Sequence, residues 1–247
     1  MLIVNYHLTD EFPGWAMAES YLTTMIEMHS PKVIFEIGSG AHPTLSIENV
    51  AKRKLRYITS DIDRRELQKA AQGYETVCLD LERGPLPQEL IGQCDMSFSR
   101  MVNEHIKDGR VYHTNVRKLL RPNGVAIHCS ATLYALPFLA NSVFPAGLSS
   151  RLLDYFARRD REQHEKFRAY YSWCRGPTRK MIDRFQGLGY DVLSYNGYFG
   201  HGYYRARLPV LDRLERAKSR ALLRMPMPLL SSYTVVVLRR RRQRNGI

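Results

Sequence analysis

Cysteine is scarce and scattered in this chain of 247 residues, which carries Cys78, Cys94, Cys129 and Cys174. No two of them form a C-x-x-C pair, so their spacing favours neither a zinc site nor a disulfide framework. We therefore expect no metal site and four free thiols, as in a reducing cytoplasm. A buried free thiol behaves as a small hydrophobic group in the core.

The chain also lacks a segment with the pattern of a membrane span or of a secretion signal. Residues 129–150 hold no charged residue, but Pro137, Asn141 and Pro145 interrupt this run, which makes it too broken to span a bilayer. The opening M-L-I-V-N-Y-H has no basic start followed by an apolar run. With 44% hydrophobic and 25% charged residues, the composition is that of an ordinary globular protein, and we expect it in the cytoplasm.

Acidic residues are few at the C-terminal end, so the positive charge is unevenly spread. The formal net charge is +13, and residues 205–247 hold 12 Lys and Arg against Asp212 and Glu215, a net +10. The other 204 residues therefore carry only +3. A nucleic-acid surface over the whole fold is not indicated, because the basic character belongs to the C-terminal segment.

Residues 33–40, V-I-F-E-I-G-S-G, are the stretch around which the chain is organised. The apolar run predicts a buried parallel strand, and Gly38-Ser39-Gly40 predicts a sharp turn that a ligand can approach closely. Pro43 suits the first turn of a following helix, but it stands where a dinucleotide fingerprint needs its third glycine. Glu36 is an acid within the strand, and a buried acid must be paired or bound.

The E-x-G-x-G arrangement resembles motif I of the class I S-adenosylmethionine-dependent methyltransferases. In that family the loop holds the methionine part of the cofactor. The resemblance implies that S-adenosylmethionine is the cofactor and that Glu36, Gly38, Ser39 and Gly40 lie against it. The alternative is a glycine turn in an α/β domain that binds nothing there.

A second acid stands at the spacing expected for a ribose contact. Residues 55–62 predict a second strand, and Asp61 near its end lies 23 residues after Gly38. An Asp also favours a helix N-cap, but Asp63 is the better cap, because R-R-E-L-Q-K-A-A follows it directly. We therefore assign Asp61 to the ribose and Asp63 to the cap.

Two further segments gain roles through the resemblance. The third strand, residues 74–79, ends at Asp80-Leu81, where the family commonly places an acid on the adenine amino group and packs the next residue near the ring. A solvated turn is the alternative. The fourth strand, residues 94–100, leads into M-V-N-E-H-I-K-D, which resembles the corresponding motif of the small-molecule branch. The predicted roles are cofactor contacts for Ser99 and Arg100 and a substrate-facing position for His105.

The remaining elements predict an α/β fold with a Rossmann-like, seven-stranded mixed sheet, helices on both faces and an antiparallel last strand. Helices are expected at residues 15–28, 43–52, 111–120, 178–187 and 209–223, and the last three strands at 125–130, 190–195 and 232–238. One domain, residues 1–238, would contain an insertion after strand five, residues 131–175. Residues 239–247 would be a basic tail.

The insertion ends in A-Y-Y-S-W-C-R-G-P, the most aromatic stretch of the chain. Insertions at this position usually build the acceptor site in this fold class, so Tyr170, Tyr171 and Trp173 are candidate substrate contacts. An equal alternative is that they are core residues under a lid. The insertion and the basic helix loosely resemble methyltransferases associated with bacterial polysaccharide and glycolipid synthesis.

The leading hypothesis is therefore S-adenosylmethionine-dependent O-methyl transfer to a sugar, glycan or lipid-linked acceptor, within polysaccharide biosynthesis. A sugar hydroxyl is a poor nucleophile, so a general base is needed, with His105 as the first candidate and His201 as the second. An RNA methyltransferase is one alternative, because the tail is basic. A non-catalytic binding module on the same fold is another.

The basic helix at 209–223 carries an apolar stripe of Val210, Leu214, Ala217 and Ala221. A basic amphipathic helix followed by a polybasic end has the composition of a membrane-surface element, which suggests peripheral contact with the inner membrane face. The simpler interpretation, which we favour at this stage, is that the stripe packs on the sheet.

Overall fold

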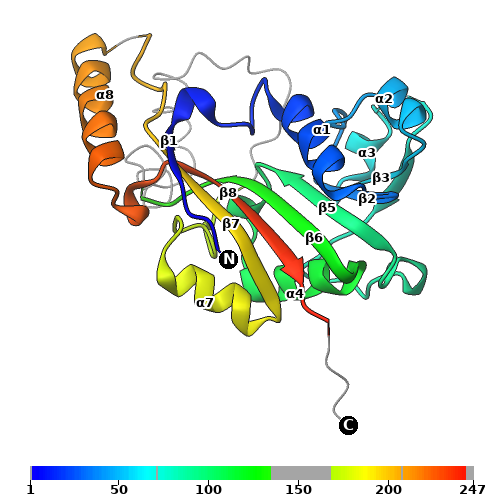
Figure 1. Ribbon diagram of the computed structural model, residues 1–247. Helices are drawn as coiled ribbons and strands as arrows, with labels where there is room; N and C mark the ends of the chain where they lie inside the picture. Colours follow the sequence, from blue (N-terminus) through cyan, green and yellow to red (C-terminus); the bar gives the residue numbers. More distant parts are fainter. Residues whose placement is uncertain (1, 71, 135–167, 207, 243–247) are drawn as a thin grey trace.

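The computed structural model describes residues 2–70, 72–134, 168–206 and 208–242 (Figure 1). Eight strands form one sheet in the order β1-β7-β8-β6-β5-β2-β3-β4. The strands are β1 (Tyr6–Leu8), β2 (Val33–Ile37), β3 (Arg56–Asp61), β4 (Glu75–Cys78), β5 (Cys94–Arg100), β6 (Leu120–Ala131), β7 (Tyr190–Phe199) and β8 (Tyr233–Arg240). The helices are α1 (Ala18–His29), α2 (Ile47–Lys52), α3 (Arg64–Leu67), α4 (Gly109–Leu119), α7 (Arg179–Gly187) and α8 (Pro209–Arg224), with short 3-10 turns η1 (Thr9–Glu11), η2 (Gln88–Leu90), η3 (Asn103–His105) and η4 (Pro228–Leu230).

The sheet confirms the predicted mixed α/β architecture. Strands β2 to β6 run parallel to one another, whereas β8 runs antiparallel to both of its neighbours, β6 and β7. The carboxyl ends of β2, β3, β5, β6 and β7 therefore meet at one edge of the sheet. In open α/β sheets this edge is where ligands bind.

The prediction of seven strands is wrong, because β1 adds an eighth at the sheet edge. Its three residues pair in parallel with β7, with Tyr6 opposite Gly197, and the Tyr6 ring stacks on Phe199 at 5.4 Å between centroids. A strand of this length is too short to show an alternation of apolar and polar residues in the sequence. It is defined instead by its contacts with β7.

Both faces of the sheet are covered by helices that bury apolar side chains. On one face α1 contributes Leu22, Met25 and Ile26 to a core that includes Ile34 of β2. On the other face α4 and α7 pack a second core around Phe35, as Figure 1 shows below the sheet. All five residues of β2 are buried, Glu36 among them, as the mostly apolar sequence of the strand predicts.

The N-terminal segment spans the ligand-binding edge from one side to the other. Its first part is β1, after which the Thr9 hydroxyl donates to the carbonyl oxygen of Phe199 at 2.9 Å. Its last part is α1, where Glu19 Oε1 accepts hydrogen bonds from the Ser46 backbone N–H (3.1 Å) and from Asn49 Nδ2 (2.8 Å). The same segment thus reaches the end of β7 and the loop that leads into α2.

Helix starts agree with the sequence at α3 and α7 but not at α2. The side chains of Asp63 and Thr178 cap α3 and α7 by accepting backbone N–H bonds. Helix α2 begins at Ile47, after the N-cap Ser46, and not near Pro43 as predicted. Residues 41–46 are an extended loop held by Glu36, described below.

Helix α8 packs with its polar side inward, so the favoured prediction that its apolar stripe packs on the sheet is wrong. Its buried residues are Asp212, Glu215, Ser219 and Leu222. Val210 and Leu214 of the stripe are 67% and 61% exposed. Two of the inward groups are acids that face a pocket, which explains why the polar face is turned toward the protein.

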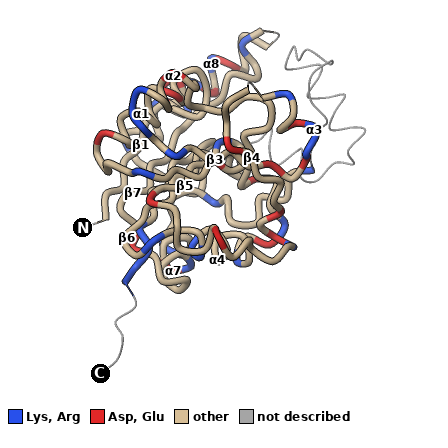
Figure 2. Tube along the Cα trace, turned by 90° about the vertical axis from the view of Figure 1, so that its right-hand side faces the viewer, with Lys and Arg blue, Asp and Glu red and all other residues tan. Residues whose placement is uncertain are grey.

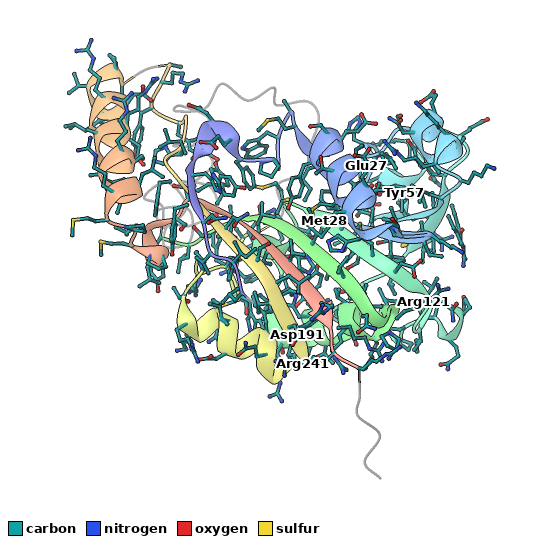
Figure 3. All side chains as sticks on the ribbon, viewed as in Figure 1. Glu27, Met28, Tyr57, Arg121, Asp191 and Arg241 are labelled. Carbon is teal, nitrogen blue, oxygen red and sulfur yellow. The ribbon has the colours of Figure 1, made fainter. Side chains whose placement is uncertain are left out.

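The basic tail begins later than predicted, because β8 continues to Arg240. Arg239 and Arg241 both form ion pairs with Asp191 of β7, at 3.1 Å and 2.7 Å. Figure 3 shows Asp191 and Arg241 side by side, and in Figure 2 the basic end of β8 leads to the C-terminus. The guanidinium of Arg240 donates to the carbonyl oxygens of Arg117 and Leu120. These three arginines fasten the strand end to the body.

Most of the predicted insertion, residues 135–167, lies outside the described residues. Its described end returns along η3 and α4, where Trp173 packs against His113 at 5.4 Å and Phe185 at 5.5 Å. A side chain at Gly109 would meet the Trp173 ring at 2.4 Å. Trp173 is therefore partly buried and packs against the core on the α4–α7 face, which agrees with the alternative prediction for this aromatic stretch and leaves its substrate contact a prediction. No helix within the described residues is long and apolar enough to cross a membrane.

We predict that Trp173→Ala destabilises the fold by about 2–4 kcal/mol, because it empties space between α4 and α7. The matched control is Tyr170→Ala from the same loop, where the ring is 40% exposed and the loss should stay near ~0.5 kcal/mol. Urea unfolding followed by circular dichroism measures both. Equal losses for the two variants would contradict the core assignment of Trp173.

Candidate active site

The turn between β2 and α2 requires glycine at two positions. Gly38 and Gly40 have φ angles of +69° and +50°, in the left-handed region that favours glycine. The backbone N–H groups of Gly38 and Ser39 donate to the carbonyl oxygen of Ser60 at 2.7 Å and 3.0 Å, which ties the turn to β3. A Cβ on Gly38 would lie 2.4 Å from Val102 Cγ2, so the turn also touches the segment that follows β5.

Glu36 braces the loop that follows this turn. Its buried carboxylate accepts two bonds from the Thr44 backbone N–H (3.1 Å and 3.0 Å), one from Thr44 Oγ1 (2.5 Å) and one from the Tyr57 hydroxyl (2.7 Å). Burial raises the pKa of Glu36, and these hydrogen bonds oppose the shift. The buried acid thus finds its predicted partners within the protein, in Thr44 and Tyr57. Glu36 would therefore act on a cofactor indirectly, by fixing the position of the loop.

Asp61 lies at the carboxyl end of β3, across from the glycine turn. Its carboxylate accepts the Asp63 backbone N–H at 2.9 Å, while burial raises its pKa. A Cβ on Gly40 would lie 3.5 Å from Asp61 Oδ2, so a side chain there would fill the space between the turn and the acid. The Ser39 hydroxyl is buried beside this space and has no hydrogen-bond partner among the described residues. An unpartnered hydroxyl in the turn and an acid at the end of the neighbouring strand are consistent with the predicted methionine and ribose contacts.

Asp80 and Leu81 follow β4, on the same side of the site as Asp61. Asp80 is half-buried, and its Oδ1 accepts the Glu82 N–H at 2.8 Å in a tight turn. A turn at Asp80 is the alternative to an adenine contact, and the adenine contact stays a prediction. Leu81 packs its side chain into the core under α4, and its place beside the adenine ring stays a prediction.

Ser99 and Arg100, the last residues of β5, point to opposite faces of the sheet. The Ser99 hydroxyl is fully buried and forms a hydrogen bond with His128 Nδ1 at 2.7 Å, and its cofactor contact stays a prediction. Burial lowers the pKa of His128 to about 3, which keeps its ring neutral. Arg100 is half-buried on the α1 face, and its charge lowers the pKa of Glu36 against the larger effect of burial. Arg100 of this pair lies toward the predicted cofactor site.

The predicted base His105 ends the short turn η3. Its ring is half-buried, and Nδ1 lies 3.2 Å from the carbonyl oxygen of Arg168. A carbonyl oxygen only accepts, so this contact assigns the Nδ1 proton. His105 thereby joins η3 to the described end of the insertion.

Sequence analysis missed Glu104, the residue before His105. Glu104 is 3% exposed, and burial raises the pKa of its carboxyl group to about 8. The carboxyl group accepts its own backbone N–H and that of Ala131 at the end of β6, while Oε2 has no partner among the described residues. The signal that could have found it is an acid four residues after a strand that ends at the ligand-binding edge. No periodicity marks it, because η3 is a single turn.

The surroundings of Glu104 are aromatic. Its backbone carbonyl accepts the N–H groups of Tyr170 and Tyr171 at 2.7 Å and 2.9 Å. Tyr171 is buried in the core, whereas Tyr170 is partly exposed with the Arg168 guanidinium 5.3 Å from its ring. Burial raises the pKa of Tyr233, and the charge of Glu104 adds to that shift, so Tyr233 also lies nearby. The predicted substrate contacts Tyr170 and Tyr171 thus adjoin Glu104, while Trp173 does not.

The structure separates His201 from this group. His201 follows β7, and β8, β6 and β5 lie between β7 and β2 in the sheet. At the usual strand spacing this is a separation of roughly 19 Å. His201 is therefore at the same edge as the glycine turn but in a different part of it.

Comparisons with known proteins agree with this arrangement. Residues 35–128 match a family model described as a methyltransferase domain, which covers β2 to β6 with the glycine turn and Asp61. No curated protein matches the chain by sequence.

Solved structures share the fold at low identity. One is a putative sarcosine dimethylglycine methyltransferase from Galdieria sulphuraria, with TM-score 0.54, 10% identity and coverage of 91% of this chain and 85% of that one. Another is a SAM-dependent methyltransferase from Archaeoglobus fulgidus, with TM-score 0.53, 12% identity and coverage of 91% and 93%. A phosphoethanolamine N-methyltransferase from Haemonchus contortus, in complex with S-adenosylhomocysteine, has TM-score 0.55 and 12% identity, covering 90% of this chain and 53% of that one.

The matched segment contains the turn, the bracing acid and Asp61, which are the parts that a sulfonium nucleoside cofactor requires. S-adenosylmethionine is the cofactor that these features and the family match have in common. Residues 35–128 therefore match the methyltransferase domain, and the fold around them is shared with solved S-adenosylmethionine-dependent methyltransferases.

Proposed function

We propose that this methyltransferase acts on a hydroxyl group of a sugar, glycan or lipid-linked small molecule, with Glu104 as the general base. The observation that carries the proposal is the buried carboxyl group of Glu104, with one oxygen unpartnered among the described residues, at the edge where β5 and β6 end. Val102, two residues earlier, touches the glycine turn. The base would therefore stand next to the cofactor.

The chemistry of the acceptor explains why a carboxyl base favours a hydroxyl. The bound cofactor supplies an electrophilic methyl group on a sulfonium. A neutral amine has a free electron pair and needs no base to attack, whereas a hydroxyl must lose its proton as the new bond forms. A carboxyl group with a pKa of about 8 is a stronger base than an ordinary glutamate and still ionises near neutral pH. Positioning of acceptor oxygen, methyl carbon and sulfur in line would supply much of the remaining rate enhancement.

His105 remains the second candidate for the base. Its Nδ1 contact with Arg168 makes Nε2 the accepting nitrogen of the neutral ring. The two residues are adjacent in the chain but differ in burial, since Glu104 is buried and His105 is half-buried.

An RNA acceptor is less favoured, because the arginines that suggested it have other partners. Arg239 and Arg241 pair with Asp191, and Arg240 donates to two backbone carbonyls. Such contacts occupy the groups that would meet phosphates.

The exposed face of α8 supports a proposal about where the acceptor is met. Its exposed charged side chains are all basic, because its two acids, Asp212 and Glu215, are buried. Val210 and Leu214 lie among these basic residues and are exposed. An apolar stripe flanked by basic residues complements an anionic lipid surface, on which a lipid-linked acceptor would be displayed.

The cofactor assignment predicts that Asp61→Ala weakens binding of S-adenosylhomocysteine by about 1–3 kcal/mol, through loss of charge-assisted hydrogen bonds to the ribose. Calorimetry on the purified protein measures the affinity. The control is Asp63→Ala, which removes the cap of α3 two residues away and should leave the affinity unchanged. Unchanged affinity in Asp61→Ala would remove this residue from the cofactor site.

The base assignment predicts that Glu104→Gln lowers turnover by about 100-fold or more and leaves cofactor affinity unchanged. Turnover of the native protein should rise with pH with an apparent pKa of about 8. Transfer of isotopically labelled methyl groups to a glycan extract, followed by mass spectrometry, measures the rate. If His105→Ala loses turnover and Glu104→Gln does not, the roles must be exchanged.

A stability measurement tests the buried carboxyl group without any acceptor. Because its folded-state pKa of about 8 exceeds the value of about 4.3 in an unfolded chain, the folded protein binds the extra proton between these pH values. The free energy of unfolding should therefore fall as pH rises through this window, by up to a few kcal/mol. Glu104→Gln cannot ionise and should lack that part of the fall, as urea unfolding at several pH values would reveal.

The membrane proposal predicts that the protein sediments with anionic phosphatidylglycerol vesicles at low salt but not with neutral phosphatidylcholine vesicles. Leu214→Gln should weaken sedimentation, because it interrupts the exposed stripe. Met28→Gln is the matched control, since Met28 is a similarly exposed apolar side chain on α1 (Figure 3). Protein that stays in solution with anionic vesicles would exclude this role for α8.

A further inference from the structure

A pocket of about 370 Å³ lies at the carboxyl end of β7, apart from the glycine turn. Its walls come from the N-terminal segment around η1, from the residues that follow β7, and from the inward face of α8. In Figure 1 these three parts lie together on the side of the molecule opposite α2 and α3. A pocket of this size is within the range that small ligands occupy.

Two buried polar side chains that line the pocket have atoms without hydrogen-bond partners among the described residues. His201 and Glu215 are each 6% exposed, and both ring nitrogens of His201 and Oε1 of Glu215 are unpartnered. His201 Nε2 lies 3.7 Å from Glu215 Oε1, which is too far for a hydrogen bond. The other carboxylate oxygen of Glu215 is held by Lys218 at 2.6 Å. Buried groups left in this way need a partner from outside the protein.

The two groups select the kind of partner. Burial lowers the pKa of His201, so its ring is neutral near pH ~7 and can offer an N–H, whereas the carboxylate oxygen only accepts. A group that bridges the ring N–H and the carboxylate must accept one hydrogen bond and donate another. A hydroxyl does both, as water does, whereas an ammonium group cannot accept and a carboxylate cannot donate.

The charges around the pocket exclude a strongly ionic ligand. The charged residues of the lining are three acids and three arginines: Asp10, Asp212, Glu215, Arg205, Arg216 and Arg220. Asp212 pairs with Arg216 at 2.7 Å, and Asp10 with Arg205 at 3.5 Å. The formal charge of the lining is therefore zero, and a neutral ligand with several hydroxyls fits it best.

Aromatic rings lead from this pocket to Glu104. Phe12 and Trp15 line the pocket, and Trp15 is 46% exposed. Both contact Tyr233, with centroids 4.7 Å and 5.7 Å apart. Tyr233 in turn lies near enough to Glu104 for that charge to add to its raised pKa, whose main cause is burial. Aromatic faces of this kind suit the apolar C–H faces of sugar rings.

We propose that the pocket between β7 and α8 binds a hydroxyl-rich glycosyl group of the acceptor, with one hydroxyl bridging His201 and Glu215 and the ring against Trp15. This inference rests on the proposed function and names its substrate class. Ala131, which contacts Glu104, ends β6, and β7 lies two strands away at roughly 10 Å. The acceptor therefore has at least two sugar-sized units, one anchored in this pocket and another carrying the methylated hydroxyl at Glu104.

The test is binding of simple glycosides to the full chain, measured by saturation-transfer difference NMR. The probes are the methyl glycosides of glucose, galactose, mannose and rhamnose at about 10 mM, a concentration that detects millimolar affinity. We expect at least one to give signals that weaken by about tenfold in His201→Phe, which keeps an aromatic ring and removes both nitrogens. Trp15→Ala, at a partly exposed position, should weaken the same signals and keeps the test valid if His201→Phe does not fold.

Controls separate this inference from the cofactor and base assignments. Asp61→Ala and Glu104→Gln should retain the glycoside signals, because neither residue lines the pocket. Binding of S-adenosylhomocysteine, measured by calorimetry on the same samples, should be unchanged in His201→Phe. Absence of signal from all four glycosides in a protein that binds S-adenosylhomocysteine would overturn the glycosyl pocket and leave the methyltransferase intact. Signals that persist equally in His201→Phe and Trp15→Ala would overturn it too.

Discussion

Gly38 lacks a side chain at the point where a methyl group of Val102 occupies the space that one would need. This contact fixes the distance between the turn after β2 and the segment after β5, which are neighbouring strands in the sheet. Two hydrogen bonds to Ser60 hold the other side of the turn against β3. The glycine turn and the turn η3 that carries Glu104 are therefore parts of one packed unit. Any larger residue at position 38 would push the turn that binds the cofactor away from the segment that carries the proposed base Glu104.

Glu36 shows how a buried carboxylate, which is unfavourable by itself, is stabilised beside the glycine turn. Four hydrogen bonds from Thr44 and Tyr57 compensate the burial of its carboxylate, and they also fix the loop that begins α2. The acid therefore shapes the protein around the ligand. The hydroxyl of Ser39, in contrast, has no partner among the described residues and is left for one that comes from outside the chain.

The parts of the fold that were predictable from sequence are those with strong local patterns. The mostly apolar run of β2, the glycine turn, Asp61 and the cap at Asp63 follow from residue types and spacing. Features that depend on distant contacts were not predictable. Strand β1 exists through its pairing with β7, and Trp173 packs, partly buried, against His113 of α4 and Phe185 of α7. Glu104 gains its raised pKa from burial by residues far along the chain, which no local pattern encodes.

Residues 6–29 connect the β7–α8 pocket, which part of this segment lines, with the loop that leads into α2. One end of this segment is held by β7 and by the Thr9 hydroxyl bond to Phe199, and the other by the bonds from Ser46 and Asn49 to Glu19. Because the chain is continuous between them, an outward movement of the segment would uncover both regions in one step. Occupation of either region would then slow escape from the other. Two ligands held under one cover acquire a coupling free energy without touching each other.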